Sequence, residues 1–197
     1  MNTSDIEKEI REHWFKDHKA TYTQYGDIKV LEWGKPGSGF YYVRYVFDRN
    51  KMYVSGDLGE AVFVFTETVD VYIQGTYSLG YFESKLRAYH EARRDFDEEK
   101  ARKRLREWLK DLKENGIKYD HDSMKDLFSE LTDCMTSDGW AFVVNMHSGF
   151  ISELEPDYFE WMYSIGDKIP SRVHGYLMGF KMASEQLRAT ESEEYVS

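Results

Sequence analysis

Apolar and polar residues alternate through three short runs between residues 40 and 66, and this alternation is typical of β-strands. Tyr41 and Val43, for example, fall on one face of the first run, because successive side chains of a strand point to opposite sides. The runs are separated by segments 48–51 (Asp-Arg-Asn-Lys) and 56–59 (Gly-Asp-Leu-Gly), whose residue types favour tight turns. The pattern therefore predicts an antiparallel meander.

The last of these runs, 60–66, is apolar on both of its faces, as Phe63 and Val64 illustrate. A strand of this kind indicates a sheet that is covered, at least in part, on both sides. Alternating residues in segments 27–33 and 69–74 predict two further strands of the same sheet.

From residue 78 onward the apolar spacing changes to three or four residues, which is typical of amphipathic helices. The clearest helix carries Ala101, Leu105 and Trp108 on one stripe, follows a capping box that begins at Asp95, and ends near Gly116. The other helices predicted in this way span residues 4–17, 78–89, 120–131, 140–146, 156–166 and 170–189.

These patterns predict an α+β fold, in which an antiparallel β-meander in the N-terminal half is packed by C-terminal amphipathic helices. A chain of 197 residues is long enough for one sizeable core, or at most for two small ones, and we expect a single domain over 1–197. Its sheet-rich part would cover 25–75 and its helical part 78–189.

Cys134 is the only cysteine, so the chain forms no internal disulfide, and this favours a reducing compartment. No N-terminal apolar run and no long apolar segment is present, which predicts neither a signal peptide nor a membrane helix. We therefore expect a cytoplasmic protein without a membrane partner.

The formal net charge of -10 argues against nucleic-acid binding through the overall field, because lysine and arginine drive phosphate binding. An acidic chain suits a basic partner through electrostatic steering, although simple solubility explains the same charge.

Positive charge is nevertheless concentrated in residues 87–118, which hold eleven Lys/Arg and eight Asp/Glu. One interpretation is a solvated helix face held by pairs four residues apart, such as Glu99 with Lys103. The other is a patch that binds nucleic acid or an acidic partner. The candidate residues for this patch are Arg93, Arg94, Arg102, Lys103 and Arg106.

A second cluster has the opposite sign and consists of Glu153, Glu155, Asp157 and Glu160. If these acids lie near the first turn of a helix, they complement the helix dipole. Alternatively, spaced carboxylates mimic phosphates and occupy a basic nucleic-acid channel on another protein.

Catalytic motifs are absent from the sequence. The segment Asp120-His121-Asp122 is the one place where acid–base chemistry is conceivable, and a helix cap explains both aspartates. The histidines show no metal-ligand spacing with the cysteine. We assign no catalytic residue, no metal site and no cofactor, and the balance is against an enzyme.

Several long stretches carry a resemblance: YYVRYVFDRNKMYVSGDLGEAVFVF, YFESKL, RLREWLKDLKENGIKYDHDSM, FISEL and SRVHGYLMGFKMASEQL. They resemble short acidic proteins carried by phages and prophages of Gram-positive bacteria, from about residue 25 to residue 187. Proteins of this kind are similar in size and charge to phage anti-defence factors, including inhibitors of type II CRISPR effectors. The resemblance carries no site motif, so it assigns no functional residue.

Three hypotheses follow. The first is a non-catalytic phage protein in the host cytoplasm that binds a host defence protein, such as a Cas9-like effector nuclease or its guide-RNA complex. It would occupy a nucleic-acid-binding surface of that effector. The second is direct nucleic-acid binding through the helix at 93–106. The third is a small nuclease or a nucleotide-acting enzyme.

Overall fold

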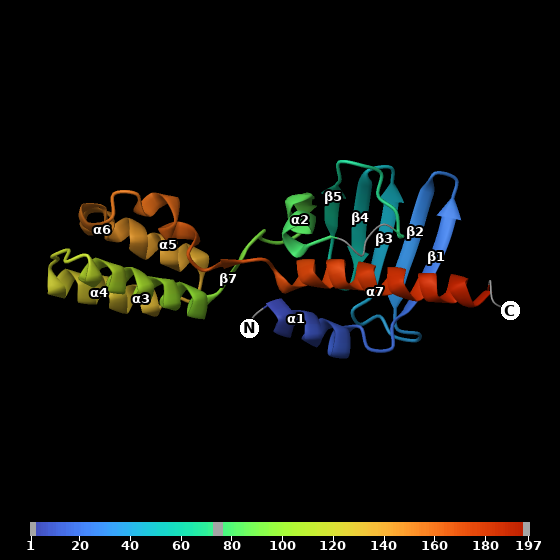
Figure 1. The fold of residues 1–197 in the computed structure, drawn as a ribbon, viewed down its shortest axis with the longest axis horizontal. Coiled ribbons are helices and arrows are strands. Elements are labelled where there is room, and N and C mark those ends of the chain that lie inside the picture. The colour runs from blue at the N-terminus through green and yellow to red at the C-terminus, as the bar shows by residue number, and fades with distance from the viewer. Residues whose placement is uncertain (1–2, 73–76, 195–197) are drawn as a thin grey trace. The chain divides into compact units, whose positions relative to one another are not determined.

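The computed structural model describes residues 3–72 and 77–194 (Figure 1). Contacts divide the chain into two compact units. Unit 1 comprises Met1–Arg93 with Ile169–Ser197, and unit 2 comprises Arg94–Lys168. Unit 2 is therefore inserted between two segments of unit 1. The sequence led us to expect one domain over 1–197, whereas each unit of the structure has a hydrophobic core of its own.

Unit 1 is built on a six-stranded sheet in which neighbouring strands follow the order of the chain. Every pair is antiparallel, so the predicted α+β class and the predicted meander are confirmed. The strands are β1 (Lys19–Tyr25), β2 (Ile28–Gly34), β3 (Val43–Asp48), β4 (Lys51–Gly56), β5 (Ala61–Val64) and β6 (Leu86–Tyr89).

One face of this sheet carries the core of unit 1. Tyr45 of β3 lies opposite Leu31 of β2 and Val54 of β4, and all three side chains are buried. The long helix α7 (Ser171–Glu194) lies across this face (Figure 1). Among the described residues, unit 1 also contains the shorter helical segments α1 (Thr3–Glu9), η1 (Ile10–Trp14), which is a π-helical turn, and α2 (Leu79–Ser84).

Small residues on α7 let large side chains of the sheet approach its backbone. A Cβ atom at Gly179 would lie 2.7 Å from the Tyr45 hydroxyl oxygen and 3.1 Å from the ring of Phe15. The Tyr45 hydroxyl donates a hydrogen bond of 2.8 Å to the Tyr176 carbonyl oxygen. The glycine therefore makes room for a buried tyrosine that is satisfied by the helix backbone.

The opposite face of the sheet is only partly covered. Val62 and Val64 are half-buried there, Arg44 is exposed, and Tyr53 is 38% exposed. The expectation of a sheet that is covered, at least in part, on both sides agrees with these exposures.

Two predicted elements of unit 1 differ from the structure. The helix expected over 78–89 is short: α2 ends at Ser84, and Leu86–Tyr89 forms the edge strand β6. The strand expected over 69–74 is wrong as far as Tyr72, where the chain forms turns, and residues 73–74 lie outside the described part.

Unit 2 is mostly helical. A two-stranded ladder, β7 (Asp95–Phe96) with β8 (Asp167–Lys168), joins its two ends. Its helices and 3-10 turns are α3 (Glu98–Glu114), α4 (His121–Thr132), α5 (Ser137–Met146), α6 (Ser148–Leu154), η3 (Tyr158–Glu160) and η4 (Met162–Ser164).

Side-chain caps define where α3 and α4 begin. The carboxylates of Asp97 and Asp120 accept hydrogen bonds from the first turns of α3 and α4, at 2.9 Å and 2.8 Å. The helix expected over 140–146 is confirmed as part of α5. The helix expected over 156–166 is replaced by the two 3-10 turns.

Candidate functional site

The candidate basic residues fall in both units. Arg93 closes the first segment of unit 1, where its guanidinium donates a hydrogen bond of 2.8 Å to the Arg87 carbonyl oxygen. Arg94 begins unit 2, and Arg102, Lys103 and Arg106 lie on α3. The structure therefore gathers only the α3 members of the predicted patch.

Arg102 has a structural role. Its Nε and Nη2 atoms donate hydrogen bonds of 3.0 Å and 2.7 Å to the carbonyl oxygen of Thr132, the last residue of α4. The same guanidinium forms ion pairs of 3.1 Å with Glu98 and with Glu99. Only 25% of its side chain is exposed, so this charge is engaged within unit 2.

The other basic residues of α3 are partly neutralised on the helix itself. Glu107 lies 2.8 Å from Arg104 and 4.0 Å from Lys103, measured between nitrogen and carboxylate oxygen. Arg106 is exposed and has no hydrogen bond or ion pair with any residue that the structure describes. The structure thus leaves α3 much less free positive charge than its sequence suggests.

The four candidate acids have a different environment. Glu153 lies in the last turn of α6, Glu155 follows that helix, Asp157 precedes the 3-10 turn η3, and Glu160 is its last residue. The expectation that the acids lie near a first helical turn is wrong for Glu153 and Glu155, and Asp157 and Glu160 meet it only at a turn of three residues. A helix dipole therefore accounts for little of this cluster. None of the four carboxylates forms an ion pair within 3–72 and 77–194.

The sequence explains why these four acids lack ion pairs among the described residues. Between Lys125 and Lys168 the chain contains no lysine or arginine, although it contains nine acidic residues. Unit 2 as a whole carries eleven Lys/Arg and eighteen Asp/Glu, a net charge of -7. The long gap between basic residues leaves the acids near residue 155 without a cation on their own segment.

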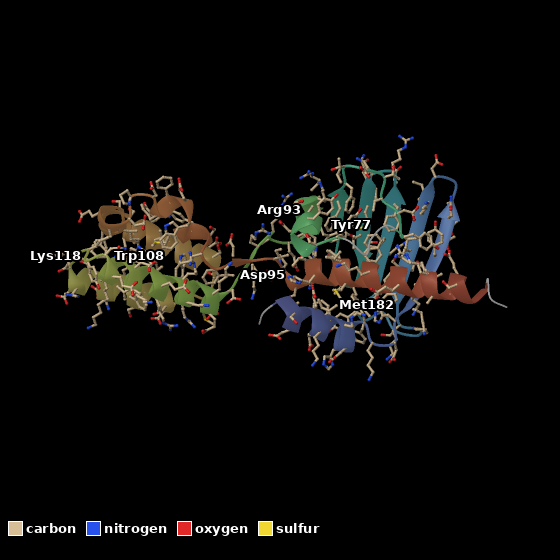
Figure 2. All side chains as sticks on the ribbon, in the orientation of Figure 1. Tyr77, Arg93, Asp95, Trp108, Lys118 and Met182 are labelled. Carbon is tan, nitrogen blue, oxygen red and sulfur yellow. The ribbon has the colours of Figure 1, made fainter. Side chains whose placement is uncertain are left out.

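Next to these acids lies a small hollow, which we call the tryptophan hollow. It has a volume of about 190 Å³. Its wall is formed by Arg104, Glu107, Trp108, Asp111, Glu155 and Trp161. Trp108, labelled in Figure 2, comes from α3 and meets Trp161 edge to face, with ring centroids 6.2 Å apart.

The hollow is acidic as well as aromatic. Arg104 and Glu107 pair with one another, which leaves the carboxylates of Asp111 and Glu155 without an ion pair among the described residues. Indole rings attract cations through their faces, and carboxylates attract them by charge. Such a combination favours a guanidinium or ammonium group as its occupant.

Phe159 adds an apolar side chain to the same segment, since it is 58% exposed on η3 between the acids. We refer to this whole region as the acidic-aromatic surface. Its members are Asp111, Glu153, Glu155, Asp157, Phe159, Glu160 and Trp161. Sequence reasoning missed Asp111, Phe159 and Trp161. The gap between Lys125 and Lys168 was the signal that could have drawn attention to this segment.

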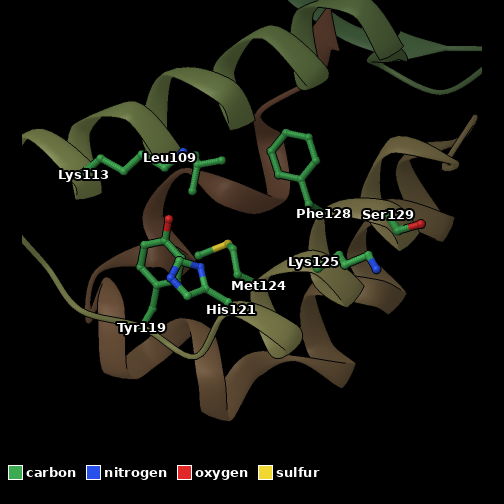
Figure 3. Close-up of a pocket in the computed structure, with 8 residues that line it drawn as sticks. All are labelled: Leu109, Lys113, Tyr119, His121, Met124, Lys125, Phe128 and Ser129. Atoms are coloured by element: carbon green, nitrogen blue, oxygen red, sulfur yellow. The ribbon is translucent and has the colours of Figure 1, made fainter.

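The segment 120–122 does not form an acid–base pair. The Asp120 carboxylate accepts a hydrogen bond from the Ser123 amide, and this bond lowers the pKa of Asp120. His121 instead lies beside the Tyr119 ring on the wall of a larger hollow, which no carboxylate lines (Figure 3). Asp120 therefore caps α4, whereas His121 lines the hollow, and the two side chains do not act together.

Other reactive groups of the chain are equally unlike a catalytic centre. Cys134 is half-buried, its thiol donates to the Glu130 carbonyl oxygen at 3.3 Å, and burial raises its pKa. A raised pKa disfavours the nucleophilic thiolate. Within the described ranges, no group of three or more His, Cys, Asp or Glu residues is arranged to hold a metal ion.

We compared the chain with known proteins and found no match. No protein-family model matches the chain, and neither a curated protein nor a solved structure matches it. Among residues 3–72 and 77–194, no helix is both long enough and apolar enough to cross a membrane.

Proposed function

We propose that this chain is a non-catalytic binding protein that docks its acidic-aromatic surface on a basic, nucleic-acid-binding surface of another protein. The observation that carries the proposal is the contrast in charge availability within unit 2. The acids at 153–160 form no ion pair with the residues that the structure describes, whereas Arg102 and Arg104 are held by glutamates of their own helix. The acids are therefore available to a partner.

Binding would begin with long-range attraction, because a unit of net charge -7 steers toward a positively charged groove. Carboxylates spaced along α6 and η3 would then take the places that phosphates occupy in that groove. Phe159 supplies an exposed aromatic anchor, and the tryptophan hollow accepts an arginine or lysine side chain of the partner.

The partner that we propose is a host defence effector of the Cas9 type, with or without its guide RNA. The resemblance of the sequence to phage-borne proteins supports this choice, and so does the basic character of channels that hold an RNA–DNA heteroduplex. In this proposal the protein acts in the cytoplasm of the infected host.

The first experiment mixes the purified full-length protein with a purified Cas9-type effector at low salt and follows co-elution by size exclusion. The affinity is then measured by biolayer interferometry at increasing salt. We expect a complex that weakens as salt rises, because charge attraction contributes to it. Failure to co-elute at low salt, with and without guide RNA, rejects this partner.

A pair of charge-matched variants tests the surface. In the first, Glu153→Gln, Glu155→Gln, Asp157→Asn and Glu160→Gln are combined. In the second, the control, Asp122→Asn, Asp126→Asn, Asp133→Asn and Asp138→Asn are combined; these acids lie in the same unit and outside the surface. We expect the first variant to lose about 100-fold in affinity and the control about threefold or less.

Equal losses in the two variants would mean that net charge alone drives binding, and would reject the acidic-aromatic surface as the docking site. Direct retention of RNA or DNA by the protein alone, abolished by Arg106→Gln, would favour the nucleic-acid hypothesis instead.

A further inference from the structure

A second hollow of unit 2 lies between α3 and α4, on a different part of this unit's surface from the tryptophan hollow, with which it shares no lining residue. Its volume is about 420 Å³, and a neighbouring hollow of about 460 Å³ shares Lys113, Tyr119 and His121 with it. We call the two together the lysine groove. Figure 3 shows the first of them.

The floor of the lysine groove is apolar. Leu109 of α3 and Met124 and Phe128 of α4 form it, and Tyr119 from the connecting loop closes one side. Met124 is almost fully buried, while Leu109 and Phe128 are half-buried, so their free surfaces face the groove. Apolar surface of this kind is stabilised when a ligand removes it from water.

The charged groups on the wall are all basic. Lys113 of α3 and Lys125 of α4 line the first hollow on either side of Met124 (Figure 3), and Lys118 lines the second. No aspartate or glutamate lines either hollow. In a unit whose net charge is -7, this is a local reversal of sign.

These lysines also have no partner within the described part of the chain. The nearest acid along α3, Glu114, pairs with Lys110 at 3.5 Å. Lys113, Lys118 and Lys125 have no ion pair or hydrogen bond with the residues that the structure describes. Their ammonium groups are therefore available to a ligand anion.

We propose that the lysine groove binds a small amphipathic organic anion, an apolar chain or ring with one carboxylate or phosphate head. The apolar part lies on Leu109, Met124 and Phe128, and the head is held between Lys113 and Lys125. The volume of the first hollow falls in the usual range of small-molecule pockets, roughly 300–1,000 Å³. This site is separate from the docking surface proposed above and does not depend on it.

Methionine methyl groups provide a direct readout. The full-length protein with 13C-labelled methionine methyls is titrated with decanoate, kept below its micelle concentration, and followed by NMR. We expect the Met124 signal, assigned with Met124→Leu, to shift saturably. Met135 and Met146, which are 72% and 61% exposed elsewhere in unit 2, serve as internal controls and stay in place. Equal shifts of all three signals would show unspecific adsorption and would overturn the proposal.

The head group is tested with three ligands of one chain length: decanoate, decyl phosphate and decanol. We expect both anions to bind at least about tenfold more tightly than the alcohol, and their order identifies the preferred head. Equal binding of decanol would reduce the groove to an apolar patch and would reject the anion site. If an acidic amphipathic peptide shifts Met124 and no decyl ligand does, the groove binds a protein segment and the proposal is wrong.

The lysines are tested by a matched pair of double variants. Lys113→Gln with Lys125→Gln removes the two charges from the groove. Lys103→Gln with Lys110→Gln removes two charges from α3 outside it. We expect about a tenfold loss of decanoate affinity in the first variant and little change in the control. Identical decanoate affinities of the two variants would show that Lys113 and Lys125 do not contribute to binding.

Discussion

The basic residues of α3 and the acidic residues of segment 153–160 are both clusters of like charge in the sequence, yet unit 2 engages them differently. An α-helix brings residues three and four positions apart together, so Glu98, Glu99 and Glu107 reach the basic side chains of α3. The acids lie at a helix end and around a 3-10 turn, on a segment without lysine or arginine.

This comparison shows that charge clustering in a sequence does not establish charge availability. Availability depends on partners one helical turn away and on backbone groups brought in by tertiary packing, such as the Thr132 carbonyl that Arg102 binds. On this criterion the acidic cluster is the better candidate for a binding surface, and the basic cluster largely stabilises unit 2.

The largest effect is expected for Arg102→Ala, which tests whether the basic cluster stabilises unit 2. It removes two hydrogen bonds to Thr132 and two ion pairs, and it leaves a carbonyl oxygen at the end of α4 without its donor. Hydrogen bonds to a charged group are worth about 1.5–3 kcal/mol, so we expect the free energy of unfolding to fall by about 2 kcal/mol. Urea unfolding followed by circular dichroism measures this loss.

Arg106→Ala is the matched control, because Arg106 lies on the same helix and is exposed. We expect a change within about 0.5 kcal/mol for this variant. Similar losses in the two variants would mean that Arg102 is only one more solvated charge, and the contrast between the clusters would fail.

A second comparison concerns acids that differ in their role. The Asp97 carboxylate caps α3 through the Lys100 amide at 2.9 Å, whereas Asp157 has no ion pair in the described part of the chain. We expect Asp97→Ala to lower the free energy of unfolding by about 1 kcal/mol and Asp157→Ala to leave it unchanged within error. The same urea titration provides both values.

The pH dependence of Asp97 gives the sign of its contribution. The hydrogen bond from Lys100 lowers the pKa of Asp97 in the folded state below its usual value of 3.8. The stabilisation is therefore complete above that value and is lost as the pH falls through the lower folded-state pKa. The difference in stability between the parent protein and Asp97→Ala should be at its full value near about pH 6 and should shrink as the pH falls below about 4. If the difference in stability between the two proteins stayed the same near about pH 2, the ionised Asp97 carboxylate would not be the stabilising cap.

Much of the fold could be predicted because local signals and tertiary structure agree. Alternation and turn residues between 40 and 66 predicted the meander. The capping box expected to begin at Asp95 placed the start of α3 two residues early, because Asp97 is the cap and Asp95 belongs to β7. The edge strand β6 could not be predicted, because Phe82, Leu86 and Tyr89 have helical spacing. The open edge of β5 overrides this local pattern by offering a ladder of hydrogen bonds.

The site was predictable only in part. The acids at 153–160 were visible in the sequence, and so was the absence of basic residues around them. The tryptophan hollow was not, because it needs Trp108 of α3 beside Trp161, which lies 53 positions further along the chain. Packing of that kind depends on how helices meet and not on any local pattern.

The smallest change in the free energy of unfolding is expected for Lys103 of the basic cluster. Lys103 lies 4.0 Å from Glu107, and 77% of its side chain is exposed. Exposed pairs four residues apart on a helix contribute about 0.3–0.5 kcal/mol, so Lys103→Gln should lower the free energy of unfolding by no more than this. Added salt should reduce the difference further, because exposed charges are screened.

Urea titrations of the parent protein and of Lys103→Gln at low and high salt measure both quantities. A loss above about 1 kcal/mol would exceed what an exposed pair contributes and would show that Lys103 is bound as firmly as Arg102. A small, salt-sensitive loss would instead place Lys103 with Arg106, as a charge that folding does not require. Within the predicted basic patch, free positive charge on α3 would then be confined to Lys103 and Arg106, since Lys113 lies outside that patch. Two such charges are too few to outweigh the acids at 153–160, which form no ion pair among the described residues.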